Sequence, residues 1–181
     1  FLISDVDLAF DIHEGTTRVV SKLTVERNGQ HARPLVLDGE GLSVRSISIN
    51  GAQVVESDFT YAGGKLTLEA VPHRFEFGAV VDIEPESNTS LEGLYRSRTM
   101  YCTQCEAEGY RKITFGLDRP DVLSTFTVSL SADKTVCPVL LSNGNEVARS
   151  DLEDGRHKVV WHDPHPKPSY LFALVAGDLQ L

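Results

Sequence analysis

Apolar and polar residues alternate one by one along several stretches of this sequence, and this alternation restricts the fold more than any other feature. The longest stretches cover residues 5–12, 75–84 and 125–132. Successive side chains of a β-strand point to opposite faces of a sheet, so each stretch predicts a strand with one buried and one solvated face. Such half-buried strands are typical of antiparallel sheets. The apolar positions are Val6, Leu8, Phe10, Ile12, Phe75, Phe77, Ala79, Val81, Ile83, Phe126, Val128, Leu130 and Ala132.

Five dipeptides that end in glycine separate the strand-like runs. Asparagine, aspartate and glycine accept the positive φ that tight hairpin turns require, so each dipeptide favours a turn between two strands. The clearest hairpin is predicted at Asp154-Gly155, with Val159 and Trp161 on the returning strand. The other four dipeptides are Asn28-Gly29, Asn50-Gly51, Gly63-Gly64 and Asn143-Gly144.

Helical signals are weak throughout the chain. The best candidate is a turn or two between Glu106 and Arg119, where Gly109 and Pro120 limit the length of any helix. We therefore predict an all-β fold, an antiparallel β-sandwich or saddle of packed sheets, with short helical turns near residues 106–120. The 181 residues show no internal repeat and no linker, which predicts a single domain over residues 1–181.

The last part of the chain departs from the alternating pattern. Three prolines in Asp163–Pro168 predict an extended, polyproline-like segment that does not pair in a sheet. The run from Tyr170 to Gly177 is almost wholly apolar, so a strand there needs cover on both faces, part of it from outside the chain. The chain also starts at Phe1 and stops soon after this run, so we expect it to be one domain of a larger protein.

Charge and cysteine content exclude several classes of partner. The formal net charge is −9, from 17 basic and 26 acidic residues, and no basic cluster offsets it, so we predict no nucleic-acid partner. No apolar run approaches the roughly 20 residues that span a bilayer, so we predict no membrane partner. The three cysteines indicate a reducing, cytoplasmic compartment rather than a disulfide framework. We expect a monomer.

The candidate binding groups lie in one polar segment, residues 101–111, which interrupts the β pattern as a loop. Glu106 and Glu108 suit either acid–base chemistry or a solvated loop, and the residues alone favour the solvated role. Cys102 and Cys105 have the spacing of half a zinc site or of a redox dithiol. No second cysteine pair and no βαβ context accompany them, so reduced structural thiols are favoured.

Two other polar clusters carry little chemistry. The residues of His162–His165 have no zinc-site spacing and predict a solvated loop. Those of Asp118–Asp121 favour a local ion pair or a turn. Because H-E-x-x-H, G-x-S-x-G and a phosphate-binding glycine loop are all absent from the sequence, we predict no catalytic residue and no metal ligand in this chain.

Several longer motifs, in order, carry a resemblance to a known family. The chain resembles the bacterial aminopeptidase N family, also called alanyl aminopeptidases, which are gluzincin-type zinc metallopeptidases. The early segment Ile3–Leu8 fits more loosely. The motifs are Leu91-Glu92-Gly93-Leu94-Tyr95, Cys102-Thr103-Gln104-Cys105-Glu106-Ala107-Glu108-Gly109, Leu117-Asp118-Arg119-Pro120-Asp121-Val122-Leu123, Leu140-Leu141-Ser142-Asn143-Gly144-Asn145, and Pro166-Lys167-Pro168 followed by residues 170–178.

The resemblance implies a function that the residues alone do not. In that family the amino-terminal domain is a β saddle packed on a thermolysin-like catalytic domain, which holds one catalytic zinc ion and the general-base glutamate beyond Leu181. It implies that Glu106 binds the free α-ammonium of a peptide substrate and that Gln104 supports it through its side-chain carbonyl. Glu108 is expected to be structural. The full-length enzyme would remove N-terminal residues from peptides, and the domain alone would be inactive.

Two alternatives remain open at this stage. The first is a free-standing β-sandwich module that binds carbohydrate or protein, although one tryptophan and 8% aromatic residues offer no evident platform for sugars. The second is an epoxide-hydrolysing member of the same superfamily. The carboxylate of Glu106 suits an amine and favours the aminopeptidase.

Overall fold

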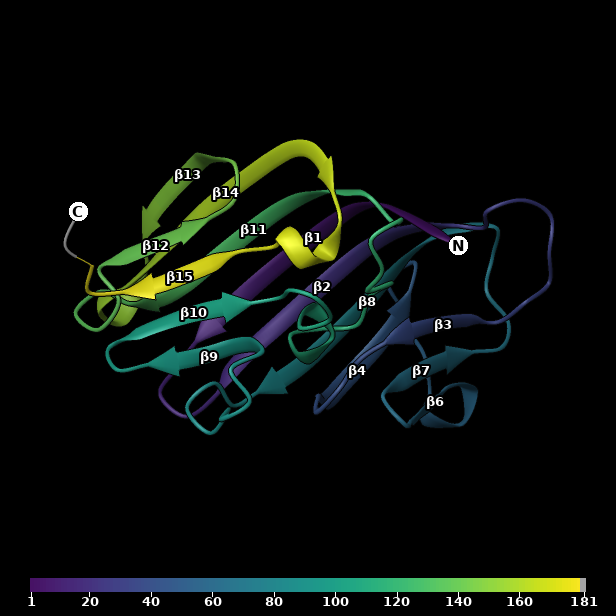
Figure 1. Cartoon of the computed structure of the whole chain (residues 1–181), viewed down its shortest axis with the longest axis horizontal. Helices are drawn as coiled ribbons and strands as arrows, with labels where there is room; N and C mark the ends of the chain where they lie inside the picture. Colours follow the sequence, from purple (N-terminus) through teal and green to yellow (C-terminus); the bar gives the residue numbers. More distant parts are fainter. Residues whose placement is uncertain (180–181) are drawn as a thin grey trace.

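The computed structural model describes residues 1–179, and within them every regular element is a β-strand or a short 3-10 turn (Figure 1). The predicted all-β fold of packed sheets is confirmed. The 3-10 turns are Glu56–Asp58, Tyr110–Lys112, Glu153–Gly155 and Ser169–Leu171, so the helical turn expected near residues 106–120 is present. No helix in the described range has the length and apolar character needed to cross a membrane.

The strands form three sheets. The large sheet has the order β13-β14-β11-β1-β2-β8-β4-β5, the second sheet β12-β15-β10-β9, and the third β3-β7-β6. The large-sheet strands are β1 (Leu2–Ile12), β2 (Thr17–Glu26), β4 (Ser43–Ile49), β5 (Ala52–Gln53), β8 (Arg74–Ile83), β11 (Ser124–Asp133), β13 (Asn145–Asp151) and β14 (Arg156–Lys167). The others are β3 (Leu35–Asp38), β6 (Thr60–Ala62), β7 (Lys65–Leu68), β9 (Gly93–Ser97), β10 (Met100–Gln104), β12 (Val139–Ser142) and β15 (Leu174–Gly177).

The two smaller sheets cover one face of the large sheet. Phe10 on β1 and Phe77 on β8 lie on this buried face, as the register of β1, β2 and β8 requires. The ring of Phe172 lies 6.0 Å from that of Phe10, and the ring of Phe115 lies 6.4 Å from that of Phe77. Figure 1 shows the second sheet in front of one end of the large sheet and the third sheet near the other end. The buried side chains therefore form one continuous core between the layers.

One pairing departs from the antiparallel expectation. β1 and β11 are parallel, from Asp5 opposite Thr125 to Asp11 opposite Ser131. Between these two strands the chain passes through both smaller sheets, so β11 can enter the large sheet from the same end as β1. The other pairs of strands in the three sheets are antiparallel.

The glycine dipeptides all lie between strands, but only three make hairpins. Asn50-Gly51, Gly63-Gly64 and Asp154-Gly155 join neighbouring strands of one sheet. Asn28-Gly29 and Asn143-Gly144 instead carry the chain from one sheet to another. The glycine of each of these two has a positive φ, 84° and 85°. A positive φ reverses the chain locally but does not decide which strand the chain then joins, so the hairpin interpretation was wrong at these two positions.

The proline-rich segment pairs in the sheet, contrary to the prediction. β14 extends to Lys167 and pairs with β11 as far as Ser124, across a register shift between Ser124 and Phe126. On its other side, β13 stops pairing at His162, so the rest of β14 is an edge. An edge strand tolerates proline because its outward backbone positions need no donor.

The apolar run near the end of the chain is covered largely by the chain itself. Phe172, Leu174 and Ala176 are buried, and β15 pairs with both β10 and β12. Leu171, at 50% exposure, stays on the surface. Gln180 and Leu181, which the predicted domain includes, lie outside the described residues.

Candidate functional site

The loop predicted to carry the site connects the two smaller sheets. Residues 101–104 were predicted to belong to the loop, but they pair with β9 as part of β10, so that part of the prediction is wrong. The loop leaves β10 at Gln104 and reaches Gly116, whose backbone pairs with Asp38 at the end of β3. The Asp38 N–H donates to the carbonyl of Gly116 (2.8 Å), and the Gly116 N–H donates to the carbonyl of Asp38 (3.1 Å). Both ends of the loop are therefore held by sheets.

The loop turns tightly at Gly109. The Gly109 N–H donates to the carbonyl of Cys105 (2.9 Å), and a Cβ at this glycine would lie 2.3 Å from the backbone oxygen of Gln104. The Cys105 side chain points into the core, where burial raises the pKa of its thiol to about 12. A glycine at this position and a buried thiol four residues earlier thus fix the path of the intervening residues.

Gly109→Ala is expected to destabilise the chain by about 1–3 kcal/mol, because the added methyl group has no room and the neighbouring carbonyl is main chain. Urea unfolding measures this change. Ala107→Ser, an exposed position in the same loop, is the control and should stay within about 0.5 kcal/mol of the original. Equal stabilities of the two variants would contradict the steric argument.

Gln104 and Glu106 both lie on the surface of this loop. The Gln104 Nε2 donates to the backbone carbonyl of Glu106 (3.1 Å), so the donor end of the amide is occupied. Within residues 1–179, neither the Gln104 side-chain oxygen nor the Glu106 carboxylate has a hydrogen-bond or ion-pair partner. A carboxylate and an amide oxygen, both acceptors, are thus presented together, and they suit a cationic donor such as an ammonium group.

Glu106 borders a pocket of about 210 Å³. Three segments line this pocket, which we call the Glu106 pocket: the loop, the turn after Asp118, and the 3-10 turn that contains Tyr170. The lining residues are Glu106, Ala107, Glu108, Asp118, Pro120 and Tyr170.

Glu108, unlike Glu106, has an ion-pair partner among the described residues. Its carboxylate pairs with the Nη1 of Arg111 at 3.2 Å, and Arg111 also pairs with the buried carboxylate of Asp118 at 3.0 Å. The Glu108 side chain is 69% exposed, and its structural role stays a prediction. Arg119 and Asp121 form the predicted local ion pair at 2.6 Å. Sequence reasoning missed the pairing of Arg111 with Asp118 and the burial of Asp118, because neither the alternation nor the motifs indicate which side chains meet.

The cysteines and the His162–His165 cluster were the other candidates for metal or redox chemistry. Cys102, Cys105 and Cys137 are free thiols. The residues His162 and Asp163 lie on strand β14, so the predicted solvated loop is wrong: the His162 Nδ1 lies 3.1 Å from the Thr127 hydroxyl, and Asp163 is buried and pairs with Lys167.

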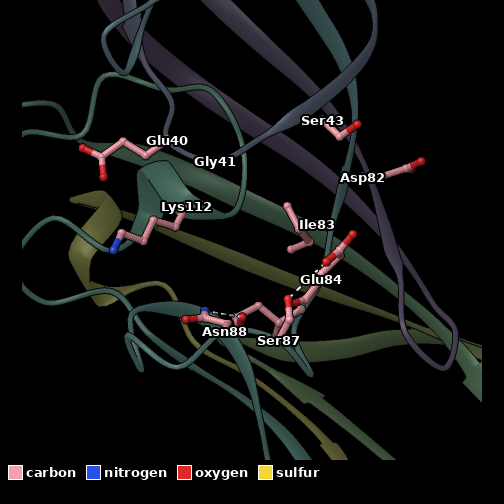
Figure 2. Close-up of a pocket in the computed structure, with 10 residues that line it drawn as sticks. Glu40, Gly41, Ser43, Asp82, Ile83, Glu84, Ser87, Asn88 and Lys112 are labelled. Carbon is pink, nitrogen blue, oxygen red and sulfur yellow. Dashed lines mark hydrogen bonds between the residues drawn. The ribbon is translucent and has the colours of Figure 1, made fainter.

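A larger pocket of about 510 Å³ contains neither Gln104 nor Glu106 (Figure 2). Glu40 and Lys112 lie on one side of it, and Ser87 and Asn88 lie across from them. Its wall also includes Asp82, whose carboxylate is taken up by Arg18 and Arg45 at 2.8 and 2.7 Å. Lys112 pairs with Glu92, which does not line the pocket, at 2.6 Å. No predicted site residue lies in this pocket.

The sequence model of the Peptidase M1 N-terminal domain family matches residues 3–171. The chain therefore belongs to this family.

Similar proteins of known type are aminopeptidases. The chain is 49% identical over 181 residues to aminopeptidase N of Caulobacter vibrioides and 48% identical to aminopeptidase N of Escherichia coli. Each alignment covers the whole of this chain but only 21% of the length of the relative. A crystal structure of Legionella pneumophila aminopeptidase A in complex with aspartic acid matches 99% of this chain and 21% of that chain, with a TM-score of 0.95 at 35% identity. An M1 zinc metallopeptidase from Deinococcus radiodurans shares the fold, with a TM-score of 0.83 at 20% identity over 99% of this chain and 42% of that chain.

Proposed function

We propose that this chain is the amino-terminal domain of a zinc-dependent aminopeptidase, and that it supplies the loop that binds the free α-amine of a peptide substrate. The observation that carries the proposal is the Glu106 carboxylate, which is exposed, has no partner among residues 1–179, and borders a pocket. Gln104, whose Nε2 donates to the backbone carbonyl of Glu106, has a side-chain oxygen that is free among the same residues. The aminopeptidase N relatives, similar over the whole chain, support it.

The chemistry of an exopeptidase explains these residue types. Such an enzyme must bind a terminal amine and reject an internal peptide bond. A substrate ammonium has three N–H donors, and the carboxylate and the amide oxygen accept two of them. Holding the ammonium fixes the first residue of the substrate, so its carbonyl comes to a defined place relative to the reacting groups. An internal residue offers neither the charge nor the donors.

The zinc ion belongs to the rest of the proposed enzyme. Among residues 1–179, the His, Cys, Asp and Glu side chains form no group of three or more that suits a metal ion, so these residues do not fit the zinc site of the family. The proposal assigns the metal ligands and the cleavage of the peptide bond to polypeptide outside this chain. The part played by this chain is binding and orientation.

We also propose that the chain is one domain of a cytoplasmic, monomeric protein and packs on its catalytic domain. One continuous core and a family match over residues 3–171 support the single domain. Three free thiols support a reducing compartment. A net charge of −9 disfavours self-association. The free-standing binding module receives no comparable support, since the similar proteins are aminopeptidases over all of this chain.

The test uses the full-length zinc-loaded protein with alanine p-nitroanilide and its N-acetyl derivative. We expect the protein to cleave the free-amine substrate in preference to the acetylated one, and to lose activity when zinc is removed. The isolated 181-residue chain is expected to bind zinc only weakly and to release no p-nitroaniline. Cleavage of both substrates at the same rate by the full-length protein would refute the proposed amine site.

A further inference from the structure

The walls of the Glu106 pocket come from three segments that are far apart in the sequence. One wall is the loop that contains Glu106 and Glu108, the second begins at Asp118, and the third includes Tyr170. A pocket of this kind keeps its shape only if the three segments are fastened to one another. The buried side chain of Asp118 and the partly buried side chain of Arg111 make that connection.

Asp118 fastens the second segment to the third. Its side chain is 1% exposed, and its Oδ1 accepts a hydrogen bond from the Ser169 hydroxyl at 2.6 Å, next to Tyr170. Its Oδ2 accepts from the backbone N–H of Arg111 at 3.2 Å and from the Arg111 Nε at 3.0 Å. The Asp118 N–H donates to the Asp38 carboxylate at 3.1 Å, which ties the arrangement to the end of β3.

Arg111 fastens the loop to the second segment. Its side chain is 13% exposed, and its Nη2 donates to the backbone carbonyl of Asp118 at 3.2 Å. On the other side, its Nη1 lies 3.2 Å from the Glu108 carboxylate. The backbone carbonyl of Arg111 accepts from the Glu40 N–H at 2.8 Å. One guanidinium group therefore connects a residue two positions from Glu106 to the buried carboxylate of Asp118.

We propose that Arg111 and Asp118 are positioning residues for the amine site: they set the place of the Glu106 carboxylate, and Arg111 keeps Glu108 from competing for the ammonium. This inference rests on the proposed function. The carboxylates of Glu106 and Glu108 border the same pocket, yet only Glu108 has a cationic partner among residues 1–179. Without the guanidinium group, two free carboxylates would face the substrate, and the ammonium would have two alternative positions.

The test measures the contribution of the amine separately from that of the zinc. In the full-length zinc-loaded protein, inhibition by alanine hydroxamate is compared with inhibition by propionohydroxamate, which has the same metal-binding group but no amine. The inhibition constant of propionohydroxamate divided by that of alanine hydroxamate measures how much the amine contributes to binding. Asp118→Asn and Arg111→Met are each expected to lower this ratio by about tenfold, because a displacement of the order of 1 Å weakens a charge-assisted contact strongly. Inhibition by propionohydroxamate should stay unchanged, and Arg111→Lys should lie between the original and Arg111→Met.

Asp82→Asn is the matched control. Asp82 is buried and has two arginine partners, as a structural ion pair would, but it does not border the Glu106 pocket. This variant should lose stability without any change in the ratio of inhibition constants. Should Asp118→Asn fail to fold, Ser169→Ala removes a single hydrogen bond to the same carboxylate and should lower the ratio by about threefold.

Glu106→Ala separates the two levels of the inference. If Glu106→Ala lowers the ratio and the Arg111 and Asp118 variants leave it unchanged, the positioning role is overturned and the proposed function stands. If Glu106→Ala also leaves the ratio unchanged, the proposed amine site itself is overturned. A lower ratio in all three variants, with Asp82→Asn unaffected, supports both.

Discussion

Replacing Glu106 with alanine in the full-length protein is expected to lower kcat/KM for alanine p-nitroanilide by roughly 10²–10³-fold. The substrate ammonium would lose its contact with the Glu106 carboxylate, and of the two acceptors proposed in this chain only the amide oxygen of Gln104 would remain. Removing one partner of a desolvated ion pair costs about 3–5 kcal/mol, and the expected loss lies near the low end because Glu106 borders an open pocket. Steady-state kinetics at saturating zinc give the value.

Glu108→Ala is the matched control for this variant. It removes a carboxylate from the same loop, but one that pairs with Arg111 and that we do not assign to the substrate. Its effect on kcat/KM should be at least about tenfold smaller than that of Glu106→Ala. An unchanged kcat/KM in Glu106→Ala, or a larger loss in Glu108→Ala, would show that the amine is bound elsewhere.

Replacing Phe172 with alanine is expected to cost about 3–5 kcal/mol of the free energy of unfolding. The Phe172 side chain is 3% exposed and joins the layers of the molecule. Its ring centroid lies 6.0 Å from that of Phe10, 5.9 Å from Phe126 and 5.8 Å from Tyr110. Alanine would leave a cavity among these rings, which the paired strands around them cannot close.

Urea unfolding of the 181-residue chain measures the loss, and Leu171→Ala supplies the comparison. Leu171 is the adjacent residue, is 50% exposed, and should change the free energy of unfolding by no more than about 0.5 kcal/mol. Similar losses in the two variants would mean that the ring of Phe172 does not connect the layers as described.

Local patterns predicted several of the strands but gave no information on long-range contacts. The alternation at Val6–Ile12 and Phe126–Ala132 identified β1 and β11 because a two-residue period depends only on neighbouring residues. Nothing in that period indicates that these two strands lie side by side and parallel, since the partners Asp5 and Thr125 are 120 residues apart. The sequence also did not predict that the proline-rich end of β14 pairs with β11. Prolines are tolerated there because β13 stops pairing at His162, and the end of β13 cannot be read from the residues of β14.

The candidate site, too, was predicted only in part from the sequence. Residue types and spacing alone favoured a solvated role for Glu106 and Glu108, and only the resemblance to a family singled out Glu106 and Gln104. The structure adds the pairing of Glu108 with Arg111 and the fastening of Arg111 to Asp118. These contacts depend on the path of the loop between two sheets, which no sequence period encodes. The role of Glu106 stays a prediction that its alanine variant tests.

The parallel pairing of β1 with β11 has a consequence for synthesis of the chain. β1 occupies the middle of the eight-stranded sheet, and one of its two edges is covered only by a strand that ends at Asp133. While the ribosome makes the intervening residues, that edge presents unpaired backbone groups to any passing strand. The nascent chain must therefore keep β1 from joining other chains until the residues up to Asp133 have emerged.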